Sequence, residues 1–96
     1  MTPPARLQAA AEVLDRIASG RAPAEEVLKA WGREHRFAGS KDRRAIADRV
    51  YRCLRGKARL GWAMGREDGR ALVIGSLALI DDLPLADIEA LFTGEG

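Results

Sequence analysis

The segment from Gly39 to Arg59, GSKDRRAIADRVYRCLRGKAR, decides the fold class of this chain. Its apolar residues recur every three or four positions, which places them on one side of an α-helix; they are Ile46, Ala47, Val50, Cys53 and Leu54. This apolar stripe must face a protein core. We therefore expect a helix whose basic side chains mostly face water or a polyanion.

Ser40 and Gly56 mark the expected ends of this helix. Ser40 is a favoured N-cap residue because its hydroxyl can accept a hydrogen bond from a free backbone N–H. Asp42 follows in the first turn, where the helix dipole stabilises an acid, and Gly56 suits the left-handed conformation that often ends a helix. Three charged residues of this helix are spaced four positions apart: Arg44, Asp48 and Arg52. At this spacing Asp48 can pair with both arginines.

Basic residues are concentrated in the same part of the chain. Ten basic and three acidic residues between Arg33 and Arg59 give this region a formal charge of +7, whereas six basic and eleven acidic residues elsewhere give −5. A solvated helix face explains any single arginine but explains this separation less well, so the region is a candidate polyanion-binding surface. The candidate RNA-binding residues are Lys41, Arg43, Arg44, Arg52, Arg55, Lys57 and Arg59.

The rest of the chain also predicts helices. Alanine and leucine are abundant, β-branched residues are few, and no run alternates between polar and apolar positions. Start signals place five further helices, beginning near residues 3, 23, 57, 69 and 84. In the helix that begins at 57, the inward positions are expected to be Leu60, Ala63 and Met64. The one over Gly69–Ile80 is apolar nearly all round and therefore belongs in the middle of a bundle. We predict one all-α domain over residues 1–96, a small bundle of about six short helices.

The side chains with the most reactive chemistry do not form a catalytic set. Cys53 lies on the apolar stripe, which predicts a buried structural cysteine. His35 is expected to face solvent at a helix end, without the neighbouring ligands of a metal site. No nucleophile, base and orienting group can be assembled from these two residues, so we expect neither catalytic nor metal-binding residues in this chain.

Four aromatic residues could stack on nucleic-acid bases, but three of them are assigned to apolar faces. Phe37 precedes the central helix and could pack on it as a hydrophobic staple, whereas Tyr51 is predicted to be the best exposed. A single cysteine cannot form an internal disulfide. No secretory signal pattern opens the chain, and no apolar run approaches the roughly 20 residues of a membrane span. We expect a cytoplasmic protein with no membrane partner.

Two segments resemble a known family. Residues 5–14 (ARLQAAAEVL) and 40–60 (SKDRRAIADRVYRCLRGKARL) are similar to the NusB-like N-terminal domain of bacterial ribosomal RNA cytosine-C5 methyltransferases, the Sun/Fmu group. The most specific part is the pattern DRxxIxxxVYxxLR. In this chain its residues are Asp42, Arg43, Ile46, Val50, Tyr51, Leu54 and Arg55.

The resemblance implies a NusB-like bundle that helps to hold ribosomal RNA against a following methyltransferase domain, which uses S-adenosylmethionine. That domain's cofactor loop and catalytic cysteines are absent, so this chain is expected to bind no cofactor and not to be an enzyme alone. The chain also looks shorter than a full NusB-like domain, and Thr93–Gly96 resemble the start of a linker or a cut. Apolar surface exposed by such a loss could support a homodimer.

Three functions remain open from the sequence. The first is an RNA-binding accessory domain, in which the first turn of the central helix, at Ser40 and Lys41, offers an extra phosphate seat. The second is a helical protein-interaction module of NusB type, either antitermination-like or docking the missing methyltransferase domain. The third is a helix-turn-helix DNA reader, because Phe37-Ala38-Gly39 precedes a basic helix as that turn does.

Overall fold

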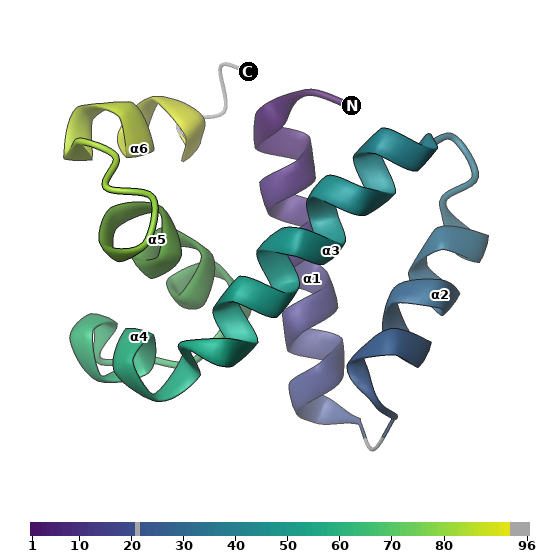
Figure 1. Cartoon of the computed structure of the whole chain (residues 1–96), viewed down its shortest axis with the longest axis horizontal. Helices are drawn as coiled ribbons and strands as arrows, with labels where there is room; N and C mark the ends of the chain where they lie inside the picture. The colour runs from purple at the N-terminus through teal and green to yellow at the C-terminus, as the bar shows by residue number, and fades with distance from the viewer. Residues whose placement is uncertain (21, 93–96) are drawn as a thin grey trace.

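The computed structural model describes residues 1–20 and 22–92, and this part of the chain forms six α-helices and no strand (Figure 1). They are α1 (Pro3–Ser19), α2 (Ala24–Glu34), α3 (Ser40–Arg55), α4 (Lys57–Met64), α5 (Gly69–Leu79) and α6 (Leu85–Phe92). The predicted all-α bundle is therefore confirmed for these residues. The predicted linker at Thr93–Gly96 lies outside them.

α1 begins where the sequence predicts. Thr2 is its N-cap, with the Thr2 hydroxyl accepting a hydrogen bond from the Ala5 N–H at 3.2 Å. Pro3 opens the first turn, where a backbone N–H is not needed. Further along α1, the side chains of three consecutive alanines are buried because α2, α3, α5 and α6 all pack against this helix. Figure 1 shows α3 crossing in front of α1.

α5 lies in the middle of the bundle, as its apolar sequence predicts. α1, α3, α4 and α6 all pack against it. Its first residue, Gly69, lies so close to α1 that a Cβ there would overlap the carbonyl oxygen of Ala11. The Gly69 N–H also donates a hydrogen bond of 2.7 Å to Asp15 Oδ1. No helix within the described ranges is both long and apolar enough to cross a bilayer.

Two predictions about the ends of α3 are wrong. The N-cap is Gly39 and not Ser40, because the carboxylate of Asp42 accepts the Gly39 N–H at 3.3 Å and caps this end. Gly56 has φ −103°, which is outside the left-handed region, because it joins α3 almost directly to α4. Among the described residues, the glycine in the left-handed region is Gly65, with φ 70°, which ends α4.

Two side chains that the sequence places inward are exposed. Phe37 is 73% exposed and does not staple α3; its neighbour Ala38 is buried in its place. Ala63 is exposed because α4 faces the core with Leu60 and Gly61. Both errors concern residues near helix ends, where the phase of a short apolar pattern is poorly determined.

Candidate functional site

The predicted cations lie on α3 and on the start of α4. Six of the seven side chains are exposed, and that of Lys57 is half-buried. Six of the seven also have no ion-pair partner among the described residues. We call these six the cationic surface: Lys41, Arg43, Arg44, Arg55, Lys57 and Arg59. Cations without an internal partner leave a positive potential available to an external anion.

Arg49 and Arg52 are held by Asp81, which follows α5. Arg52 Nη1 lies 3.2 Å from Asp81 Oδ1, and Arg49 donates two hydrogen bonds to the same carboxylate. The hydrogen bond from Arg49 is the main reason why the pKa of Asp81 lies below its usual value. The predicted pairing through Asp48 is therefore wrong, because Asp81 takes Arg52 and Asp48 forms no ion pair in the described part of the chain. Arg52 remains exposed and shares the single carboxylate of Asp81 with Arg49, so the three side chains together keep one positive charge.

An acid occupies the N-terminus of α3. Asp42 Oδ1 accepts a hydrogen bond of 2.8 Å from Arg6 Nε, and Asp42 Oδ2 lies 3.5 Å from the amino group of Met1. The hydrogen bond from Arg6 is the main cause of the lowered pKa of Asp42. Because this carboxylate already satisfies the positive end of the helix, the structure does not support the predicted phosphate seat at Ser40 and Lys41.

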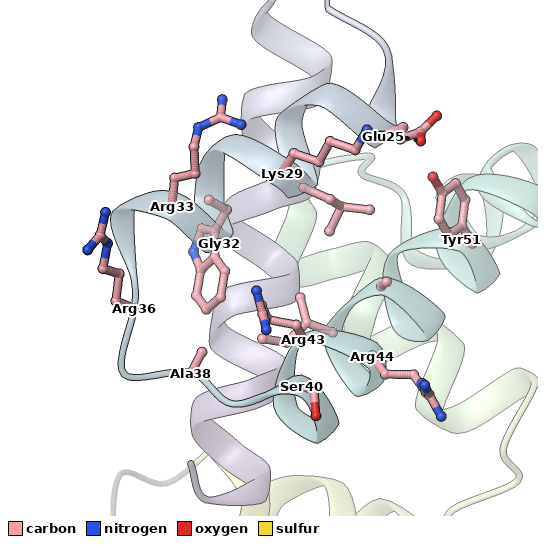
Figure 2. Close-up of a pocket in the computed structure, with 14 residues that line it drawn as sticks. Glu25, Lys29, Gly32, Arg33, Arg36, Ala38, Ser40, Arg43, Arg44 and Tyr51 are labelled. Atoms are coloured by element: carbon pink, nitrogen blue, oxygen red, sulfur yellow. Dashed lines mark ion pairs between the residues drawn. The ribbon is translucent and has the colours of Figure 1, made fainter.

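A groove of about 950 Å³ lies between α2 and α3 (Figure 2). Arg43 stands between the two helices, Arg33 and Arg36 lie on the α2 side, and Arg44 lies on the α3 side. The groove exists because α2 packs chiefly on α1 and leaves its side toward α3 open. Its apolar lining consists of Leu28, Trp31, Ala38, Ile46 and Ala47.

Arg43 reaches across the groove to α2. A Cβ on Gly32 would lie 3.4 Å from Arg43 Cδ, so the missing side chain at Gly32 leaves room for this arginine. At the other end of the groove, Lys29 pairs with Glu25 at 3.5 Å, near Tyr51. The α3 wall therefore carries the unpaired cation Arg43 inside the groove, and the ion pair of Lys29 and Glu25 lies at one end of it.

Arg33 and Arg36 are site residues that the sequence did not assign. Both are exposed and have no ion-pair partner in the described ranges, and both line the groove. The only signal for them was their place in the basic region that begins at Arg33. No spacing along the chain indicated that α2 would lie beside α3.

Two surfaces therefore meet on this protein and share Arg43 and Arg44. One is the cationic surface, and the other is an apolar groove with basic edges. No family model, curated protein or solved structure matches the chain. The chemistry of these two surfaces is the basis for assigning a function.

The aromatic side chains differ from their predicted exposure. Trp62 is 87% exposed and Phe37 73%, against 37% for Tyr51, so Tyr51 is not the best exposed aromatic residue. Trp31 is buried and stacks on His35, with ring centroids 4.2 Å apart. His35 does end α2, but its ring is half-buried and its Nδ1 donates to the Trp31 carbonyl at 2.8 Å.

Cys53 is buried, as predicted. Its Sγ lies 3.6 Å from the carbonyl oxygen of Leu72, and burial raises the pKa of the thiol. Within the described ranges, no group of three or more His, Cys, Asp or Glu residues is arranged to hold a metal ion. The side chains on α2 and α3 offer positive charges and apolar contacts, and both can bind a ligand.

Proposed function

We propose that this chain is an RNA-binding accessory domain that positions ribosomal RNA for an S-adenosylmethionine-dependent cytosine-C5 methyltransferase domain of the same parent protein, in the cytoplasm. The observation that supports it most is the cationic surface, whose six side chains have no ion-pair partner in the described structure. The choice of RNA among polyanions depends on the resemblance of the α3 motif to the NusB-like domain of the Sun/Fmu group.

The cationic surface would act by neutralising phosphates. α3 has 16 residues and is about 24 Å long, so its cations can reach several phosphates of one strand. Each neutralised phosphate releases counterions and makes the affinity fall with salt. Phosphate contacts orient RNA without reading its sequence, so the choice of cytosine would belong to the methyltransferase domain. Arg52 would contribute less, since it shares the Asp81 carboxylate with Arg49.

A matched pair of double variants tests this proposal. Arg44→Gln with Arg55→Gln removes two unpaired cations, whereas Lys29→Gln with Arg66→Gln removes two cations that already pair with acidic residues. Both variants have the same net charge. Binding is measured by fluorescence anisotropy with a labelled ribosomal RNA hairpin and with a DNA duplex of equal length, across a salt series.

We expect the first variant to bind the RNA hairpin more weakly and to reduce the slope of log affinity against log salt by about 1 per cation removed. The second variant should bind like the unaltered protein. Equal losses in both would show that only net charge matters and would contradict the assignment of the surface. Failure of the unaltered protein to bind RNA at low salt would reject the proposal, and tighter binding to the DNA duplex would favour the DNA-reading alternative.

A further inference from the structure

The groove between α2 and α3 suits a ligand of a different class from RNA. We propose that it binds an acidic amphipathic helix of a protein partner. Such a helix would place its apolar side on the floor of the groove and its acidic side chains against the basic edges. This site is separate from most of the cationic surface, and only Arg43 and Arg44 belong to both.

The packing of the bundle leaves apolar surface uncovered along the groove. α3 packs against α1, α4 and α5, whereas α2 packs chiefly against α1. As a result Leu28 of α2 and Ala47 of α3 are only half-buried, although they lie beside buried side chains such as Ile46. A helix laid between α2 and α3 would cover both. α2 has 11 residues and is about 16 Å long, which matches about three turns of a bound helix.

The charges at the edges select an acidic partner. Arg33 and Arg36 on the α2 side and Arg44 on the α3 side have no ion-pair partner among the described residues. The acid lining the groove, Glu25, already pairs with Lys29. Both long edges are therefore positive, and a helix with Asp or Glu on both flanks of its apolar stripe is complementary to them. Such edge charges mainly determine the association rate and the orientation of the partner.

The floor of the groove suits aliphatic side chains better than bases. RNA bases are usually recognised by stacking on an exposed ring or guanidinium plane. The ring of Trp31 is only 3% exposed and is already stacked on His35. Arg43 crosses the floor, the other floor residues are aliphatic, and Tyr51 lies at one end. Leucine or isoleucine side chains of a helix would fill such a floor.

The probe for this proposal is a synthetic helical peptide of about four turns, with leucines spaced three and four apart and glutamates on both flanks. A matched peptide carries lysine in place of every glutamate. Binding to the isotope-labelled protein is followed by amide chemical shifts. We expect the glutamate peptide to shift amides of α2, of the loop at residues 35–39 and of the first half of α3, and the lysine peptide to bind at least about tenfold more weakly.

Charge-reversal variants locate the site. The two test variants are Arg36→Glu, in the loop between α2 and α3, and Arg43→Glu, inside the groove. The control variant, Arg59→Glu, makes the same charge change on α4, outside the groove. The first two should each weaken binding of the glutamate peptide roughly tenfold, and the third should leave it unchanged. Because Arg36 has no side-chain partner in the described structure, its variant remains informative if Arg43→Glu fails to fold.

Three results would overturn the proposal: peptide-induced shifts centred outside the groove, equal binding of the two peptides, or an RNA hairpin that displaces the peptide and shifts the amides of α2 and of the loop at residues 35–39, which lie outside the cationic surface. The peptide assay is independent of RNA binding. The accessory-domain proposal can therefore fail while the groove still binds the acidic peptide, and the reverse outcome is equally distinguishable.

Discussion

Arg49 of α3 and Asp81, which follows α5, form a two-pronged ion pair: Arg49 Nη1 lies 3.1 Å from Asp81 Oδ1, and Arg49 Nη2 lies 2.7 Å from Asp81 Oδ2. The two side chains are only 17% and 20% exposed. Arg49 also donates to the buried Ser76 hydroxyl at 3.2 Å, and that hydroxyl donates to the Val73 carbonyl. The pair therefore joins the middle of α3 to the end of α5 and removes one arginine from the surface available to a ligand.

Replacing Arg49 with methionine should destabilise the fold. Arg49→Met keeps an apolar stem of similar length but leaves the half-buried Asp81 carboxylate without its main donor. We expect a loss of about 1–3 kcal/mol in the free energy of unfolding, measured in urea by circular dichroism. Arg59→Met is the control, because Arg59 is exposed and has no ion-pair partner in the described ranges; it should change stability by less than about 0.5 kcal/mol. Equal losses would mean that the pair does not join α3 to α5.

Stability should fall in acid because several carboxylates, Asp81 and Asp42 among them, hold lowered pKa values. Arg49 lowers the pKa of Asp81 and Arg6 lowers that of Asp42, from an ordinary value of 3.8. The folded state therefore binds these protons less readily than the unfolded state. The stabilisation is present above about pH 4 and is lost as the pH falls through the lowered values. We expect the urea midpoint to decrease below pH 4, and to decrease less in Asp81→Asn; an unchanged acid dependence in that variant would contradict this role for Asp81.

Gly69 cannot accept a side chain without moving α5 away from α1. Its Cβ would overlap the backbone carbonyl of Ala11, which cannot rotate aside as a flexible side chain could. Gly69→Ala should therefore cost about 3 kcal/mol or more, measured by thermal unfolding. Gly65→Ala is the comparison, because a Cβ there meets nothing within 4 Å but φ is 70°; it should cost only about 1–2 kcal/mol. A tolerated Gly69→Ala would show that the two helices are not in such close contact.

Val50 lies at the centre of the α3 apolar stripe and is fully buried. Val50→Asp would bury a carboxylate with no partner nearby, so we expect this variant to be unfolded, as measured by circular dichroism. Val50→Ala removes only apolar contact and should cost about 2 kcal/mol while leaving the protein folded. A folded, soluble Val50→Asp protein would mean that α3 turns a different face to the core.

Signals within a few residues of each other were sufficient to predict the helices. The Thr2 cap of α1 and the Asp68 cap of α5 act over three residues, the Asp68 carboxylate accepting the Ala71 N–H at 3.3 Å. The apolar spacing of α3 also placed Cys53 and Val50 in the core, because helical geometry alone assigns a face to each position. These rules were less successful at helix ends, where Ser40 and Gly56 were given the wrong roles.

The sequence did not show which arginines form ion pairs within the protein and which remain available to a ligand. Arg49 and Arg52 look like other arginines of α3, yet both pair with Asp81, which is 32 and 29 residues away. The groove likewise depends on α2 lying beside α3 without packing closely against it. Contacts between residues so far apart follow from how the helices pack around α1 and α5, and local spacing carries no information about that packing. The helices and their buried faces are thus properties of short segments, whereas the binding surfaces are properties of the assembled bundle.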